Sequence, residues 1–122
     1  MKITVSATGN TMDSQIDQRF GRAAAFVFVE TDTMDFEAID NAAAASSGGA
    51  GIAAAQLVAD KDVKAVITGN VGPNAMNVLN AANIGIYKVG ALTVKENVEL
   101  FKKGELERIS KTVPAHFGMG NK

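Results

Sequence analysis

The chain of 122 residues contains no cysteine. This absence excludes disulfide bonds, a thiolate nucleophile and a metal site built from protein thiolates. Any metal that the protein binds must be held by other side chains or must arrive with its own ligands.

Long apolar segments are also missing. No apolar run approaches the roughly 20 residues that a membrane-spanning helix needs. The first residues, Lys2 to Ala7, have the pattern of a strand and not that of a signal peptide. We expect a cytoplasmic protein without a membrane partner.

Aromatic residues make up 6% of the chain, and Tyr87 is the single tyrosine. The net charge of −1 is unevenly divided: residues 1–60 carry three basic and eight acidic side chains, and residues 61–122 carry nine basic and five acidic. The basic residues are scattered, whereas nucleic-acid binding usually requires a clustered basic face with stacking aromatics. We therefore expect no nucleic-acid partner.

Groups for catalysis are scarce as well. His116 is the only histidine, and no G-x-S-x-G motif is present, which excludes hydrolysis by a Ser-His-Asp triad. Two-metal nucleases need several carboxylates, typically one on the first strand, but residues 2–7 contain none. We expect a binding protein and not an enzyme.

What the chain does contain is the balance of one globular domain, with 47% hydrophobic and 20% charged residues. Apolar periodicity predicts strands, helices and loops in the order β-β-β-α-β-α-β-α. The expected strands are 2–7, 25–30, 35–39, 63–67 and 84–88, and the expected helices are 52–59, 75–82 and one opened by the capping box Thr93-x-x-Glu96. This order predicts an α/β fold with a mixed five-stranded sheet and helices on both faces. Residues 1–110 should form the domain and 111–122 a flexible tail.

The stretch from Thr68 to Ala75 is the most informative loop. Two glycines allow the backbone to approach a ligand, and Pro73 suits the first turn of the following helix. The free amides and the positive end of the helix dipole should face an anion. The alternative is that Gly69 and Gly72 only form the turn.

A second loop, residues 41–51, consists of alanine, serine, glycine and asparagine, and also leads into a helix. Ligands of open α/β sheets bind beyond the carboxyl ends of the strands. Residues 6–10, 46–51 and 69–74 should therefore meet at one edge of the sheet.

With these loops in place, the chain resembles the dinitrogenase iron-molybdenum cofactor biosynthesis family. The resemblance depends on Asp17-x-Arg19-Phe20-Gly21-Arg22, on Ser46-Ser47-Gly48-Gly49-Ala50-Gly51 and on Gly69-Asn70-Val71-Gly72-Pro73-Asn74-Ala75. It implies a ribonuclease H-like fold and a preassembled molybdenum-copper, or iron-molybdenum type, sulfide cluster held without covalent bonds. A carrier of this kind also implies a protein partner for cluster delivery or signalling.

A sulfide-rich anion with filled metal coordination would need weak N–H and hydroxyl donors, a cation and an apolar wall. The candidate cofactor-binding residues are Thr8, Asn10, Arg19, Phe20, Arg22, Ser46, Ser47, Gly48, Gly49, Gly69, Asn70, Gly72, Pro73 and Asn74. His116 and Met119 in the tail are candidate soft metal ligands.

Several of these residues have a structural alternative. Phe20 and Met76 fit a hydrophobic core, one of Arg19 and Arg22 could pair with Asp13 or Asp17, and Ser46 and Ser47 could cap a helix. The alternative function is a regulatory module that binds a small anion or a nucleotide, although neither G-x-x-x-x-G-K-[ST] nor G-x-G-x-x-G occurs.

Overall fold

The computed structural model describes residues 1–42 and 49–109 and contains eight elements in the predicted order. The strands are β1 (Lys2–Ala7), β2 (Ala25–Glu30), β3 (Phe36–Asp40), β4 (Ala65–Thr68) and β5 (Gly85–Lys88). The helices are α1 (Ala50–Asp60), α2 (Pro73–Ala81) and α3 (Val94–Lys102). The predicted bounds differ from these by a few residues, as expected when local pattern alone sets an element's end.

The five strands form one mixed sheet in the order β3-β2-β1-β4-β5. β1 pairs in parallel with β4, and β4 pairs in parallel with β5, whereas β2 is antiparallel to both β1 and β3. The carboxyl ends of β1, β3, β4 and β5 therefore share one edge of the sheet, which we call the carboxyl edge.

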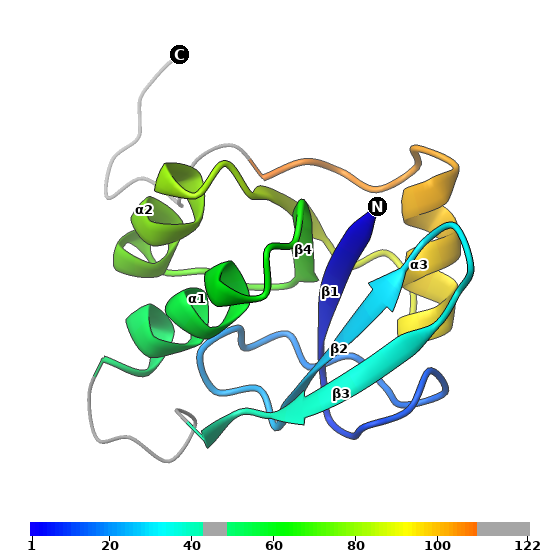
Figure 1. The fold of residues 1–122 in the computed structure, drawn as a ribbon, viewed down its shortest axis with the longest axis horizontal. Helices are drawn as coiled ribbons and strands as arrows, with labels where there is room; N and C mark the ends of the chain where they lie inside the picture. The colour runs from blue at the N-terminus through cyan, green and yellow to red at the C-terminus, as the bar shows by residue number, and fades with distance from the viewer. Residues whose placement is uncertain (43–48, 110–122) are drawn as a thin grey trace.

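The helices cover both faces of the sheet, with α1 and α2 on one face and α3 on the other (Figure 1). Phe20, Phe26, Phe28 and Val66 pack under α1 and α2. The opposite face of the sheet packs against Val94 and Val98 of α3, and its core comprises Ile3, Val5, Ala7, Val27, Val29, Ala65 and Ile67. Each large side chain buried in these layers contributes about 1.5–3 kcal/mol of hydrophobic stabilisation.

α3 has the ends that its sequence predicts. Thr93 accepts a hydrogen bond from the backbone N–H of Glu96, whose side chain accepts one from the Thr93 N–H, which completes the capping box. Gly104 follows the C-cap residue Lys103 and has φ of +72°, the left-handed conformation that glycine favours.

The last described residues extend the sheet along β5. Arg108 forms an antiparallel bridge with Tyr87, and the Ile109 N–H donates to the Ile86 carbonyl oxygen at 2.7 Å. Residues 107–109 therefore run antiparallel to β5, away from the carboxyl edge. None of the helices in residues 1–42 and 49–109 has the length and apolar character needed to cross a membrane.

Candidate functional site

Two helix N-termini lie together at the carboxyl edge of the sheet. A Cβ placed on Gly51 of α1 would be 3.4 Å from the Ala75 Cβ of α2. We call residues Gly49–Gly51 and Gly69–Asn74 the glycine rim. The described parts of the two predicted loops therefore meet on one side of the molecule, as the proximity of α1 and α2 in Figure 1 also shows.

A further segment, residues 17–24, holds the two halves of the glycine rim in place, and we call it the 17–24 loop. A Cβ on Gly21 would lie 2.8 Å from both the Cα and the nitrogen of Gly51, so a side chain there would collide with backbone. A Cβ on Gly69 would lie 2.6 Å from the Gln18 Cβ. Gly21 and Gly69 are therefore required by the close approach of chain segments.

Main-chain and side-chain hydrogen bonds attach the 17–24 loop to the segments that follow β3 and β4. The Asn70 N–H donates to the Gln18 carbonyl oxygen at 2.6 Å, and the Phe20 N–H donates to the Asn70 carbonyl oxygen at 3.2 Å. On the other side, the Asn41 amide donates to the carbonyl oxygens of Gly21 and Ala23 at 3.2 and 2.9 Å. The loop therefore bridges the ends of β3 and β4.

The buried hydroxyls of Ser6 and Thr68 link the 17–24 loop to β1 and β4. Ser6 Oγ lies 2.5 Å from the Asp17 carbonyl oxygen and 2.7 Å from Thr68 Oγ1. A hydroxyl has one hydrogen and a carbonyl oxygen can only accept, so when Ser6 donates to Asp17 the Thr68 hydroxyl must donate to Ser6. Both side chains are completely buried, and this chain of donors joins β1, β4 and the 17–24 loop.

Arg19 forms an ion pair with the Asp17 carboxylate. Asp17 Oδ1 accepts hydrogen bonds from the Arg19 backbone N–H and Nε at 3.0 Å each, and Oδ2 accepts from Nη2 at 2.9 Å. The Arg19 guanidinium lowers the pKa of Asp17 below the ordinary 3.8, although burial acts in the opposite direction. The same pairing raises the pKa of Arg19.

The starts of α1 and α2 differ from the start of α3. Gly49 and Gly72 are the N-cap residues of α1 and α2, and neither provides a side-chain hydrogen bond. In α2 the first intrahelical bond runs from the Met76 N–H to the Gly72 carbonyl oxygen, so the N–H groups of Asn74 and Ala75 have no partner within the helix.

In α3, by contrast, the first N–H groups are used within the chain. The Val94 and Lys95 N–H groups donate to the carbonyl oxygens of Ser14 and Met12 at 3.0 and 2.9 Å. The beginning of α3 is therefore satisfied by the protein itself, whereas the N–H groups of Asn74 and Ala75 at the beginning of α2 have no partner within the helix and lie at the glycine rim.

Gly72 distinguishes the two interpretations of the loop glycines, which either allow a ligand to approach or only form the turn. Its φ of −74° and ψ of 167° are open to any residue, and a Cβ there would have no neighbour within 4 Å. The fold itself therefore does not require glycine at this position. The missing side chain instead leaves open space over the first donors of α2.

The surroundings of the glycine rim carry few charges. Residues 41–59 and 65–87 contain no aspartate, glutamate, lysine, arginine or histidine. Arg22 follows Gly21, which packs on Gly51, and it is exposed. The helix dipoles and the neighbouring 17–24 loop thus set the local potential.

Several other predicted residues have structural roles. Phe20 is 1% exposed, with its ring centroid 5.3 Å from that of Phe26, and Met76 is 3% exposed. Both belong to the core under α1 and α2. The prediction of Phe20 as a ligand wall is therefore wrong, because its whole ring is buried in this hydrophobic layer. Pro73 is the first residue of α2, as predicted.

Thr8 and Asn10 belong to a loop that leads toward α3. Thr8 Oγ1 donates to the Gln15 carbonyl oxygen at 3.1 Å, and Gln15 bridges to Thr93 just before α3. Ser46, Ser47, Gly48, His116 and Met119 lie outside the described residues, as does the predicted tail 111–122.

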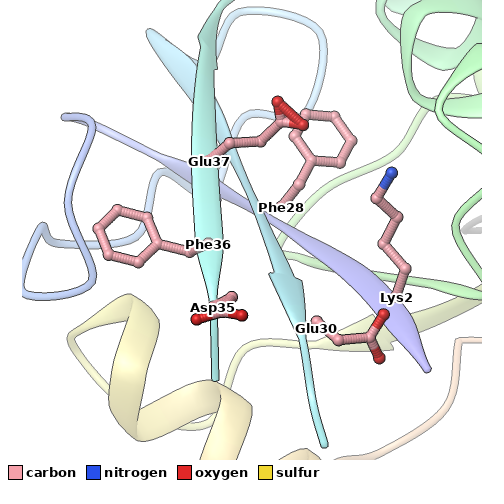
Figure 2. A pocket seen from close by; sticks show the side chains of 6 residues that line it. All are labelled: Lys2, Phe28, Glu30, Asp35, Phe36 and Glu37. Atoms are coloured by element: carbon pink, nitrogen blue, oxygen red, sulfur yellow. The ribbon is translucent and has the colours of Figure 1, made fainter. Parts of the chain in front are cut away.

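A hollow of about 230 Å³ lies at the opposite end of the sheet, between the start of β1, the end of β2 and the start of β3. Figure 2 shows its mixed lining, with the Phe36 ring on the opposite side of β3 from Glu37. One lysine and three carboxylates border it, an arrangement unsuited to an anion. Its lining residues are Lys2, Phe28, Glu30, Asp35, Phe36 and Glu37.

Sequence reasoning missed Ser6, Thr68 and Asn41 as supports of the site. Alternation in β1 places Thr4 and Ser6 opposite Ile3 and Val5, a pattern that suggests an exposed polar face. No local signal indicates that this face is covered.

The fold and the glycine rim define a class: a small α/β protein in which two glycine-capped helices begin side by side at the carboxyl edge of a mixed sheet. The family model for the dinitrogenase iron-molybdenum cofactor matches residues 1–104. The chain belongs to this family.

Individual relatives agree with this membership. The chain is 32% identical over 111 residues to an uncharacterized protein of Methanocaldococcus jannaschii, covering 88% of this chain and 91% of that protein. It is 41% identical to the orange protein of Desulfovibrio gigas, solved in its apo form, with a TM-score of 0.85 and coverage of 89% and 92%. A NifB-like protein from Thermotoga is 28% identical, with a TM-score of 0.80 and coverage of 94% and 98%.

Proposed function

We propose that this protein binds and carries a preassembled anionic metal-sulfide cluster, of molybdenum-copper or iron-molybdenum type, and does not catalyse a reaction. Family membership and the similarity to the orange protein support a metal-cluster ligand. A carrier also needs a partner protein that supplies or receives the cluster. The carboxylate-free β1 argues against two-metal nuclease chemistry, although the strand order is compatible with a ribonuclease H-like fold.

The observation that carries the proposal is the open space at Gly72. A helix N-terminus attracts anions through its free N–H groups and its dipole, and an N-cap serine, threonine or aspartate would normally occupy those groups. Glycine at this position leaves them available although the backbone conformation does not require it.

The residues of the glycine rim suit a cluster that brings its own ligands. The chain has no cysteine, and no group of three or more histidine, cysteine or acidic side chains in residues 1–42 and 49–109 is placed to hold a metal ion. The rim instead presents main-chain N–H groups and amide side chains, which can donate to bridging sulfides. When bound, the cluster would supply the metals and the sulfides, and the protein would supply donors and shape.

Reconstitution with tetrathiomolybdate and copper tests the proposal. The protein should acquire sulfide-to-metal charge-transfer absorption. Gly72→Ser should weaken cluster binding about tenfold, because the hydroxyl fills the space and accepts the first N–H groups of α2, while it leaves stability unchanged or raises it by a few tenths of a kcal/mol.

Gly104→Asn provides a matched control. Gly104 also borders a helix, but it follows α3 in a left-handed conformation that asparagine tolerates. This variant should bind the cluster as wild type does. A colourless wild-type protein, or Gly72→Ser with unchanged affinity, would contradict the proposed site.

A further inference from the structure

A carboxylate lies beside the proposed anion site. Asp17 is 6% exposed and is the one buried charged side chain among the described residues. It accepts three hydrogen bonds from Arg19, at 2.9–3.0 Å, and two of these come from the guanidinium. Burying a carboxylate is costly without such a partner, so Asp17 and Arg19 act as one neutral unit.

The pair adjoins the glycine rim. Arg19 forms a parallel bridge with Asn70, two residues before Gly72. The next charged residues along the chain are Lys64, which precedes β4 at the amino ends of the strands, and Lys88, the last residue of β5, which pairs with Thr68. The Asp17 charge is therefore one of the few that can alter the potential at the rim.

Arg19 by itself would favour anion binding. Its side chain is 67% exposed, with Nε and Nη2 facing Asp17 and Nη1 outside the pair. Pairing removes the net charge but leaves directional N–H groups. The affinity for an anion should then come mainly from the helix dipoles and backbone amides, which are less sensitive to salt than a free cation.

We propose that Asp17 limits the affinity of the site: it neutralises Arg19, so that an anionic cluster is held by main-chain donors and can be released. This inference rests on the proposed function. It makes Asp17 a residue that adjusts the affinity through Arg19 and does not itself contact the ligand.

The test compares wild type with Asp17→Asn, Arg19→Ala and the double variant, each reconstituted with tetrathiomolybdate and copper and titrated by charge-transfer absorption. Asp17→Asn should bind about threefold more tightly at low ionic strength, because a positive charge is uncovered beside the glycine rim, and should lose this gain at high salt. Relative to wild type, the double variant has the same net charge and Arg19→Ala has one positive charge less. The affinity of each should lie within about twofold of the value expected from this difference in net charge.

A structural role for Asp17 cannot account for tighter binding, because a damaged loop would only weaken the site. Asp13→Asn is the matched control: it removes the same charge from an exposed residue nearby in the chain and should change affinity by less than about 1.5-fold. Equal tightening by Asp13→Asn would overturn the proposal, because it would reduce the effect to net charge.

Wild type supplies a measurement that does not depend on the folding of any variant. Its affinity should change by less than about threefold between 20 and 300 mM salt, and a steeper loss would overturn the proposal. Charge-transfer absorption missing from every protein would refute the proposed function as well. Equal binding by wild type and Asp17→Asn would refute the role of Asp17 alone.

Discussion

At the scale of single residues, the positions of the site differ in whether, and why, their local structure requires glycine. Gly21 and Gly69 are needed because backbone approaches their Cα atoms, Gly49 because its φ is +71°, and Gly72 for neither reason. A substitution at each position therefore tests a different interaction.

Gly21→Ala should destabilise the protein by about 2 kcal/mol, because its Cβ would lie 2.8 Å from the Gly51 backbone and α1 would have to shift. Gly72→Ala is the control and should cost less than about 1 kcal/mol, since open space surrounds its Cβ. Urea unfolding of both variants measures the difference. Equal losses would mean that the 17–24 loop does not pack on α1 in solution.

Asp17 should make the stability depend on acid. Its pKa is lowered in the folded protein, mainly by the Arg19 hydrogen bond, so its contribution is fully present above the unfolded value near 3.8 and is lost as pH falls through the folded value. Asp17→Asn should cost about 1–3 kcal/mol at pH 7.

The difference in unfolding free energy between wild type and Asp17→Asn should then narrow below about pH 4, which urea titrations at pH 7 and pH 3 can measure. A difference that stays constant across this range would show that the Asp17 carboxylate gains nothing from Arg19.

At the scale of elements, the three helices differ in how their first turns are capped. α3 is closed by its own capping box and by carbonyl oxygens from the preceding loop, whereas α1 and α2 begin with glycine. α3 also contains Asn97, which is completely buried and fixes the loop before the helix.

Asn97→Ala should destabilise the protein by about 2–4 kcal/mol. Asn97 Oδ1 accepts hydrogen bonds from the Gly90 and Ala91 N–H groups, and its amide donates to the Ala91 and Thr93 carbonyl oxygens. Removing it leaves buried groups unpaired. Asn77→Ala, the same change at an exposed position of α2, should stay within about 0.5 kcal/mol of wild type.

At the scale of the whole molecule, the directions of the strands decide which segments meet at the proposed site. β1, β3, β4 and β5 run in one direction and β2 in the other, which brings four carboxyl ends and two helix N-termini to one edge. The open hollow at the opposite end has a mixed lining of one lysine and three carboxylates.

Ligand binding at this edge should stabilise the entire fold. At a free cluster concentration about 100 times Kd, mass action adds about 2.7 kcal/mol, which corresponds to a rise of roughly 10 °C in Tm for a domain of this size. ATP at millimolar concentration should leave Tm unchanged. A shift with ATP and none with the cluster would favour the alternative, a nucleotide-binding regulatory module.

The element order could be predicted from sequence because its signals are local. Pro73 begins α2 and Thr93 caps α3 through interactions within one helical turn, and apolar periodicity identified all five strands. The family resemblance also followed from short motifs. These features need no knowledge of distant contacts.

The tertiary structure alone decided how the site is assembled. Ser6 and Thr68 are 62 residues apart, and their burial follows from the central position of β1, which alternation along one strand cannot reveal. Packing likewise placed Phe20 in the core, chose Arg19 as the partner of Asp17 and directed Thr8 toward α3. Local preferences act over a few residues, whereas the burial and the partners of these side chains depend on which distant segments pack against them.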